Sequence, residues 1–292
     1  MSSEGNFHIS VMVKEVLEGL AVKSGGKYID CNLGGGGHTA EIMKRGGFVL
    51  GIDCDQESIS YVERNFERQI NDGKLLIRLG NFSRLGELAK SCGFNQVDGI
   101  LYDLGLSSFQ LERSGRGFSF QRHEPLDMRM DNQLKVRASD LVNGLSKYEL
   151  CKLFEQFGEE QHSWAVAQAI VSARALEPIV RTDQLANVVR EVLGYKRGSL
   201  HPATRVFQAL RLAVNQELFN ASESFKQAIE LLGSGGRLVI ISFHSLEDRL
   251  SKNLRENKCL VPVNRKPIIP SGNEILANPR CHSAKMRIYE KI

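Results

Sequence analysis

The sequence predicts an α/β fold, in which a parallel β-sheet covered by helices is interrupted by an inserted helical segment. Two observations predict it. Between residues 27 and 105, short apolar runs alternate with stretches at helical spacing. After Gly105 the alternation stops, and a polar, turn-rich stretch (107–135) leads into helical patterns only, until strand-like runs return at 235–245 and 284–292.

The first half of the predicted sheet comes from four apolar runs, at residues 27–30, 47–55, 74–81 and 97–105. After the second run, Ile59, Val62, Phe66 and Ile70 recur near the 3.6-residue period and predict one helix. Ser83 is placed to cap the helix after the third run. Strands that alternate with helices predict a parallel sheet, which binds ligands beyond the carboxyl ends of its strands.

Helix-start signals mark the inserted segment. Ser146 and Glu149 have the spacing of a capping box. Thr182 or Asp183 is placed to cap a second helix, and Pro202 has the place of a first-turn proline in a third. Near the C-terminus, residues 262–279 predict a long loop.

Length and composition favour a globular protein of two domains. The chain has 292 residues, 42% of them hydrophobic and 25% charged. We expect one discontinuous domain from residues 1–108 and 214–292, and an inserted substrate-recognition domain from residues 109–213. No apolar run reaches the length of a membrane span, no signal peptide is evident, and the six cysteines show no metal-binding spacing. Reduced thiols in a bacterial cytosol are expected.

Charge is uneven along the chain. Residues 245–292 hold ten Lys or Arg and five Asp or Glu, against a net charge of +4 for the whole protein. Such a basic segment is compatible with phosphate contacts and equally with an ordinary solvated surface.

Four consecutive glycines, 34 to 37, follow the first predicted strand in the stretch "IDCNLGGGGHT". A tight turn alone needs fewer glycines, and a dinucleotide site needs a third glycine where Thr39 stands. The third alternative is a loop that binds S-adenosylmethionine. The tail of this cofactor would lie directly against the backbone, which explains the glycines. Asp30 precedes the loop, and Gly34 and Gly36 lie within it. Asp53 ends the second strand, where it is placed to accept the ribose hydroxyls or to begin a turn.

The end of the fourth strand, "DLGLSS" (103–108), suggests the chemistry. The amine of a nucleobase is a poor nucleophile, because its lone pair is delocalised into the ring. Asp103 and the Leu104 carbonyl are placed to accept its two N–H groups as a methyl group arrives. The two prolines common at this position in amine methyltransferases are absent.

Several blocks together make a specific resemblance. The chain contains "HISVMVKEVLEGL", "GGGGHT", "DGILYDLGLSSFQL", "HPATRVFQALRLAVNQEL" and "GGRLVIISFHSLEDR", in this order. It resembles the MraW/RsmH family of ribosomal RNA methyltransferases. The resemblance implies a class I (Rossmann-like) methyltransferase sheet with a helical insert, S-adenosylmethionine as cofactor, and methylation of N4 of cytosine 1402 in 16S rRNA of the small ribosomal subunit. The cofactor residues that motif and resemblance together indicate are Gly34, Gly36, Gly37, His38, Asp53, Phe82, Asp103 and Gln110.

Substrate contacts are hypotheses of our own. RNA recognition requires an unstacked cytosine, which favours aromatic and basic side chains. The side chains that we predict to contact RNA are Ser107, Ser108, Phe118, Phe120, Arg129, Lys196, Arg197, His201, Arg205 and His244. For Phe118 and Phe120 the alternative is a short strand that buries both rings, and for His244 it is a structural role.

Two other functional classes stay open. A nicotinamide oxidoreductase is disfavoured by the missing third glycine. A non-catalytic RNA-binding assembly factor would keep the fold without turnover. The sequence leaves homodimer formation open, and it predicts no membrane partner.

Overall fold

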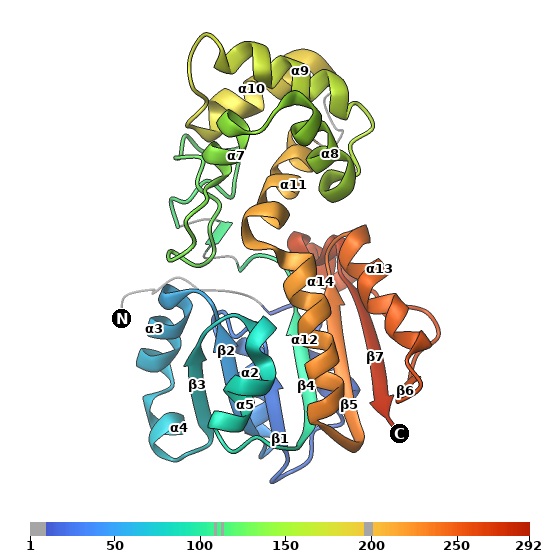
Figure 1. The fold of residues 1–292 in the computed structure, drawn as a ribbon. Coiled ribbons are helices and arrows are strands. Elements are labelled where there is room, and N and C mark those ends of the chain that lie inside the picture. The colour runs from blue at the N-terminus through green and yellow to red at the C-terminus, as the bar shows by residue number, and fades with distance from the viewer. Residues whose placement is uncertain (1–9, 108–109, 112–113, 196–200) are drawn as a thin grey trace. The chain divides into compact units, whose positions relative to one another are not determined.

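The computed structural model describes residues 10–107, 110–111, 114–195 and 201–292 (Figure 1). The chain divides into two units. One consists of Met1–Ser107 and Leu218–Ile292, and the other of Ser108–Glu217. We call them the sheet unit and the helical unit.

The sheet unit contains one seven-stranded sheet of order β3-β2-β1-β4-β5-β7-β6, which Figure 1 shows. The strands are β1 (Lys27–Asp30), β2 (Phe48–Asp53), β3 (Leu75–Leu79), β4 (Val97–Asp103), β5 (Leu232–Ser242), β6 (Leu260–Pro262) and β7 (Lys285–Lys291). The first five pair in parallel. The strand order reverses between β1 and β4, the point at which open parallel sheets bind ligands.

Alternation along the central strands sends side chains into two cores. Ile29 and Tyr102 pack against α5 (Leu85–Ser91) and α12 (Glu217–Leu231) on one face. Tyr28 and Leu101 pack against α1 (Val13–Gly19), α2 (Gly37–Lys44) and α3 (Gln56–Asn65) on the other. Strands buried on both faces explain the near-continuous apolar runs in the sequence.

Two predictions near the N-terminus are wrong in detail. The single helix expected through Ile70 is broken at Phe66, which separates α3 from α4 (Glu67–Asn71) with a backbone at φ −121°, ψ 23°. The Phe66 ring instead packs beside Gly36, where an added Cβ would lie 3.0 Å from it. Asn81, not Ser83, provides the cap: its Oδ1 accepts from the Ser83 N–H at 2.8 Å and opens a 3-10 turn before α5.

The C-terminal part also differs from expectation. β7 runs antiparallel to β5, and the short β6 pairs antiparallel with β7, so the sheet is mixed at this edge. The stretch predicted as a loop contains α14 (Gly272–Ala277) and a backbone bridge from Ile268 to Met286. The helix α13 (Ser245–Asn253) follows β5.

The helical unit contains α7 (Ala138–Gly144), α8 (Lys147–Gly158), α9 (Ser163–Arg174), α10 (Thr182–Leu193) and α11 (Thr204–Asn215). The predicted capping box of Ser146 and Glu149 is confirmed at α8. At α10 the prediction is wrong, because Arg181 is the N-cap residue and Gln184 accepts its N–H. The helix expected to open at Pro202 begins at Thr204.

Candidate active site

Three carboxylates meet at one edge of the sheet. Asp30, Asp53 and Asp103 are the last residues of β1, β2 and β4. Parallel register places Asp30 beside Gly51 of β2 and beside Leu101 of β4. The three side chains therefore lie around the point where the strand order reverses, as expected for a ligand site in such a sheet.

The glycine loop joins β1 to α2, and its glycines have different physical reasons. Gly34 and Gly36 have φ of +49° and +75°, a region that strongly favours glycine. An added Cβ would lie 3.0 Å from the Phe66 ring at Gly36 and 2.1 Å from Ser10 Oγ at Gly37. At Gly34 the nearest atom would be 3.8 Å away. Protein packing thus accounts for two positions at which the sequence suggested a ligand, while Gly34 leaves space above its backbone.

Asp53 fixes this loop to the end of β2. Its Oδ2 accepts the Gly34 N–H at 2.8 Å and its Oδ1 accepts the Asp55 N–H at 2.9 Å. Burial raises the pKa of Asp53 to about 6, and the two backbone N–H groups oppose that shift. Each carboxylate oxygen keeps a second lone pair, so the group is able to accept a hydroxyl as well.

Asp30 is a structural anchor beneath the loop. It is buried, its Oδ2 accepts the Thr39 hydroxyl at 2.8 Å, and its Oδ1 accepts the Asn32 N–H at 3.3 Å. Burial raises the pKa of Asp30. Because it holds both sides of the turn, Asp30 sets the path of the chain from β1 into α2.

His38 and Asp103 form a buried pair with unused polar atoms. The His38 Nε2 lies 3.5 Å from Asp103 Oδ2, and the His38 side chain is only 4% exposed. Among the residues that the structure describes, neither ring nitrogen of His38 has a hydrogen-bond partner, and neither has Asp103 Oδ1, although all three atoms are buried. Burial lowers the pKa of His38, but the carboxylates of Asp103, Asp30 and Glu274 together raise it above its ordinary value. Unsatisfied buried polar atoms are costly, and such a pair therefore points to a missing ligand.

The residues present fit S-adenosylmethionine. A sulfonium and an ammonium group favour neighbouring carboxylates, which Asp30 and Asp103 provide. The open space above Gly34 suits close approach to the backbone, and Asp53 is an acceptor for ribose hydroxyls. The Oδ1 of Asn32 is another buried acceptor without a hydrogen-bond partner.

Phe82 lies between core and surface. Its ring meets the Tyr102 ring edge-on, with centroids 5.9 Å apart, and it packs against the core while staying partly exposed. This position is compatible both with the core role and with adenine stacking, which stays a prediction.

His244 has a structural role. It is the N-cap residue of α13: its Nδ1 accepts the Glu247 N–H at 3.4 Å, and its Nε2 lies 3.1 Å from Glu247 Oε1. These contacts give His244 a structural role at the start of α13. Its Nε2 is also buried without a hydrogen-bond partner among the described residues, so its predicted contact with substrate stays a prediction. Ser107, also predicted to contact substrate, is half-buried at the end of the sheet unit's first segment.

Two predicted residues of the helical unit, Gln110 and Phe118, are buried, and a third, Arg129, is partly buried. Gln110 is 5% exposed, and Phe118 is 7% exposed with the Arg116 guanidinium 5.6 Å from its ring centroid. Arg129 binds Asp127 with two hydrogen bonds of 2.7 and 2.8 Å and also donates to the Leu134 carbonyl. These contacts give Phe118 and Arg129 internal roles, so their burial does not support the predicted RNA contact. The chain around Phe118 and Phe120 does not form the alternative strand.

A second group in the helical unit is more accessible. Phe120 stacks on His201 with centroids 4.5 Å apart, and the half-exposed Tyr195 lies 5.4 Å from the same imidazole. Arg205 is exposed. Burial, helped by the charge of Arg190, lowers the pKa of His201.

Three predicted substrate residues, Ser108, Lys196 and Arg197, lie outside the described residues. Three partners were missed by sequence reasoning. They are Ser10 beside Gly37, Phe66 beside Gly36, and Glu274, which accepts the Met12 N–H at 2.5 Å and acts on His38. Each comes from a distant part of the chain, and no local pattern indicated it.

Within the described part of the chain, no cluster of His, Cys, Asp or Glu has the makings of a metal site. None of the described helices has the length and apolar character needed to cross a bilayer.

Comparison with known proteins gives the family of the chain. The model of the MraW methylase family matches residues 5–292. The chain belongs to the MraW methylase family. The mixed seven-stranded sheet with its reversal between β1 and β4 is the class I, Rossmann-like arrangement.

Relatives of this MraW-family chain carry a more specific name. A protein of Thermomicrobium roseum called ribosomal RNA small subunit methyltransferase H is 47% identical, over 98% of this chain and 94% of its own length. A protein of the same name from Carboxydothermus hydrogenoformans is 41% identical, over 98% of both chains. Among solved structures, a putative methyltransferase of Streptococcus mutans in complex with SAH has 10% identity and a TM-score of 0.46, over 97% of this chain and 99% of that one.

Proposed function

We propose that this protein uses S-adenosylmethionine to methylate the exocyclic N4 amine of cytidine 1402 in 16S rRNA of the small ribosomal subunit, in the cytoplasm. Family membership and the relatives' names support an rRNA methyltransferase. One observation supports an amine as the methyl acceptor. Asp103 Oδ1, at the end of β4, is a buried carboxylate oxygen that has no hydrogen-bond partner within the described part of the chain.

The cofactor would supply a methyl group already activated on a positively charged sulfur. Asp103 Oδ1 would accept one N–H of the amine, which helps its lone pair leave the ring as the nitrogen becomes tetrahedral. The His38 Nε2 lies 3.5 Å from the other oxygen of Asp103, so the imidazole would help to fix the position of this carboxylate. As the N–C bond forms and the S–C bond breaks, the surplus proton passes to Asp103 or to water.

Positioning is expected to supply most of the acceleration, with about 7–11 kcal/mol available from that source. Asp53 would hold the ribose and the glycine loop the cofactor's tail. In the helical unit, Arg205 and the stack of Phe120, His201 and Tyr195 are the accessible candidates for RNA contact.

The test is methyl transfer from labelled S-adenosylmethionine to small ribosomal subunits that lack the modification, with identification of the product nucleoside. N4-methylated cytidine that disappears in Asp53→Ala and Asp103→Ala would support the proposal. Cofactor binding without transfer would favour the assembly factor. A different methylated nucleoside would contradict the proposed specificity.

A further inference from the structure

A pocket of about 360 Å³ lies at the carboxyl end of β5. Phe243, His244 and Ser245 line it directly after β5 ends at Ser242. Lys285, the first residue of β7, pairs with Ser242 in the antiparallel register and lines the pocket from the neighbouring strand. The pocket therefore belongs to the same sheet edge as Asp103 and is separate from the residues that we assign to the cofactor.

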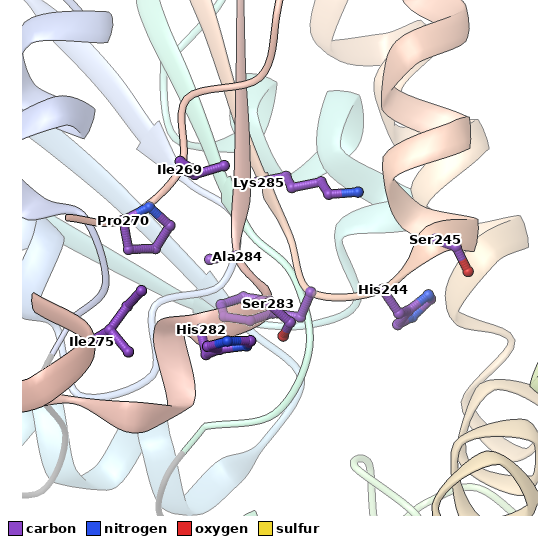
Figure 2. A pocket seen from close by; sticks show the side chains of 10 residues that line it. His244, Ser245, Ile269, Pro270, Ile275, His282, Ser283, Ala284 and Lys285 are labelled. Atoms are coloured by element: carbon purple, nitrogen blue, oxygen red, sulfur yellow. The ribbon is translucent and has the colours of Figure 1, made fainter. Parts of the chain in front are cut away.

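The wall of the pocket has two chemical parts. Figure 2 shows Ile269, Pro270 and Ile275 on one side and His244 with Ser245 on the opposite side. His282, Ser283 and Lys285 lie between them. Ile269 is 65% exposed, so its apolar side chain is accessible to a ligand. An apolar wall beside cationic and hydroxyl groups suits a ligand with a flat apolar part and an anionic part.

The electrostatics favour an anion. None of the described residues that line the pocket is acidic. Carboxylates that neighbour the lining residues in the chain have partners: Asp248 binds Arg287 at 2.7 Å, and Glu247 accepts the Phe243 N–H at 2.8 Å. Glu274, beside Ile275, accepts the Met12 N–H at 2.5 Å. Lys285 lies 3.5 Å from Asp248 and is about half exposed, so its ammonium is available to a further anion. The whole stretch 245–292 has ten basic and five acidic residues.

The pocket lies one strand away from the proposed methyl acceptor site. Asp103 pairs with Ile241 of β5, and the Leu104 N–H donates to the Ile241 carbonyl at 3.1 Å. An added Cβ at Gly105 would lie 3.4 Å from the Phe243 ring, so the pocket borders the loop that follows Asp103. Adjacent strands are about 4.8 Å apart, a distance that a neighbouring nucleotide of one RNA strand is able to bridge.

We infer that this pocket binds a nucleotide adjacent to the target cytidine in single-stranded RNA. The base and ribose pack on Ile269, Pro270 and Ile275, and the phosphate binds Lys285 and His282. Single-stranded RNA is recognised by aromatic rings, on which its bases stack, together with basic groups along its backbone. The pocket offers the Phe243 ring beside its aliphatic wall, and the basic side chain of Lys285. The inference rests on the proposed function, because it takes RNA as the substrate.

The experiment measures RNA affinity by fluorescence anisotropy, with the full-length protein, saturating S-adenosylhomocysteine and a labelled single-stranded RNA of the sequence around the target cytidine. Lys285→Ala is expected to weaken binding roughly tenfold and to reduce the slope of log affinity against log salt by about 0.7, the value for one phosphate contact on a single strand. Lys258→Ala is the matched control. It removes one exposed lysine of the same basic segment, just before β6, which pairs at the opposite end of β7. Equal effects of the two variants on affinity and slope would overturn the inference.

A second comparison tests the apolar wall. An RNA with an abasic nucleotide beside the target is expected to bind the native protein several-fold more weakly than the intact RNA does. The Ile269→Ser protein is expected to bind both RNAs equally, since the substitution and the abasic site remove the same contact. Independent, additive losses would contradict base contact in the pocket. Failure of the proposed function gives a different result: RNA binding that depends on Lys285, together with no N4-methylcytidine from the native enzyme, would keep the pocket and reject the reaction.

Discussion

Two sets of largely buried polar residues differ in their hydrogen bonding. One set is His38 and Asp103 in the sheet unit, and the other is Arg129 and Asn215 in the helical unit. Both His38 ring nitrogens and Asp103 Oδ1 lack hydrogen bonds to any residue that the structure describes. Arg129 in contrast binds Asp127 through two nitrogens and donates a third to backbone carbonyls. Asn215 accepts the Met130 N–H at 2.7 Å and donates to the Met128 carbonyl at 2.8 Å.

The difference separates structure from function. A buried polar network in which every atom is paired holds its unit together and needs nothing else. A buried pair with unused donors and acceptors costs free energy unless a ligand completes it. From the sequence, Arg129 and Asp103 were both candidates for function, and only their partners distinguish them.

The largest expected effect is at Asp103. Asp103→Ala removes the acceptor for the amine and should lower kcat about 10²–10³-fold, a typical cost for the loss of one preorganised group. Single-turnover methylation of the small subunit measures it. Asp98→Ala, which removes a carboxylate from the same strand near its other end, should leave kcat near the native value. Native turnover in Asp103→Ala would show that the unpartnered oxygen of Asp103 has no role in methyl transfer.

The structural cluster should respond in stability. Arg129→Ala removes both guanidinium hydrogen bonds to the partly buried Asp127 and the bond to the Leu134 carbonyl, so we expect a loss of about 2–4 kcal/mol in the free energy of unfolding. Urea denaturation measures it. Arg122→Ala, which removes an arginine 49% exposed, should cost less than about 0.5 kcal/mol. A stable Arg129→Ala protein that loses RNA binding would instead restore the RNA role predicted from the sequence.

Asp53 links cofactor binding to pH. Burial raises its pKa to about 6, so the carboxylate is ionised above that pH and protonated below it. Affinity for S-adenosylhomocysteine should fall as the pH drops below about 6, by up to roughly tenfold per pH unit, as the ionised acceptor is lost. Isothermal titration calorimetry at a series of pH values measures it. Asp53→Asn should bind weakly with a flat pH profile, and a steep profile in that variant would assign the titration to another group.

Because the pKa is raised, Asp53's own contribution to stability is present at low pH and declines as the pH rises to about 6.

His38 should give the smallest effect, visible as a pH dependence of stability. Burial lowers its pKa, but the Asp103, Asp30 and Glu274 carboxylates raise it above the ordinary value of about 6.5. Because the pKa is raised in the folded state, the contribution of His38 to the free energy of unfolding is fully present below its ordinary pKa. This contribution is lost as the pH rises through the pKa of His38 in the folded protein. The native protein's advantage over His38→Asn in urea denaturation should therefore shrink with rising pH. A constant difference would show that the pair does not titrate as described.

Local patterns predicted much of the fold. The strands that became β1 to β5, the capping box at Ser146 and the glycine turn before α2 all depend on residues close together in the sequence. The carboxylates of Asp53 and Asp103 were found in the same way, because both end buried strands. Their common location follows from the parallel register alone.

Other features depend on partners far apart in the chain. The strand predicted at 284–292 is confirmed as β7, but its antiparallel pairing with β5 was not predicted. The break at Phe66 was also missed. Thr182 does not cap α10, because its hydroxyl bonds to the distant Arg122 carbonyl and Glu124 N–H.

By itself, the sequence determined the sheet, its loop of glycines and the residue types at its carboxyl edge, since apolar periodicity and turn chemistry are local. Only the tertiary structure decided which polar groups are paired. It placed Asp103 against His38 and left one of its oxygens without a hydrogen bond, and it enclosed Arg129 with Asp127. The physical reason is that a polar side chain has the same sequence signature whether its hydrogen bonds go to the protein or remain for a ligand.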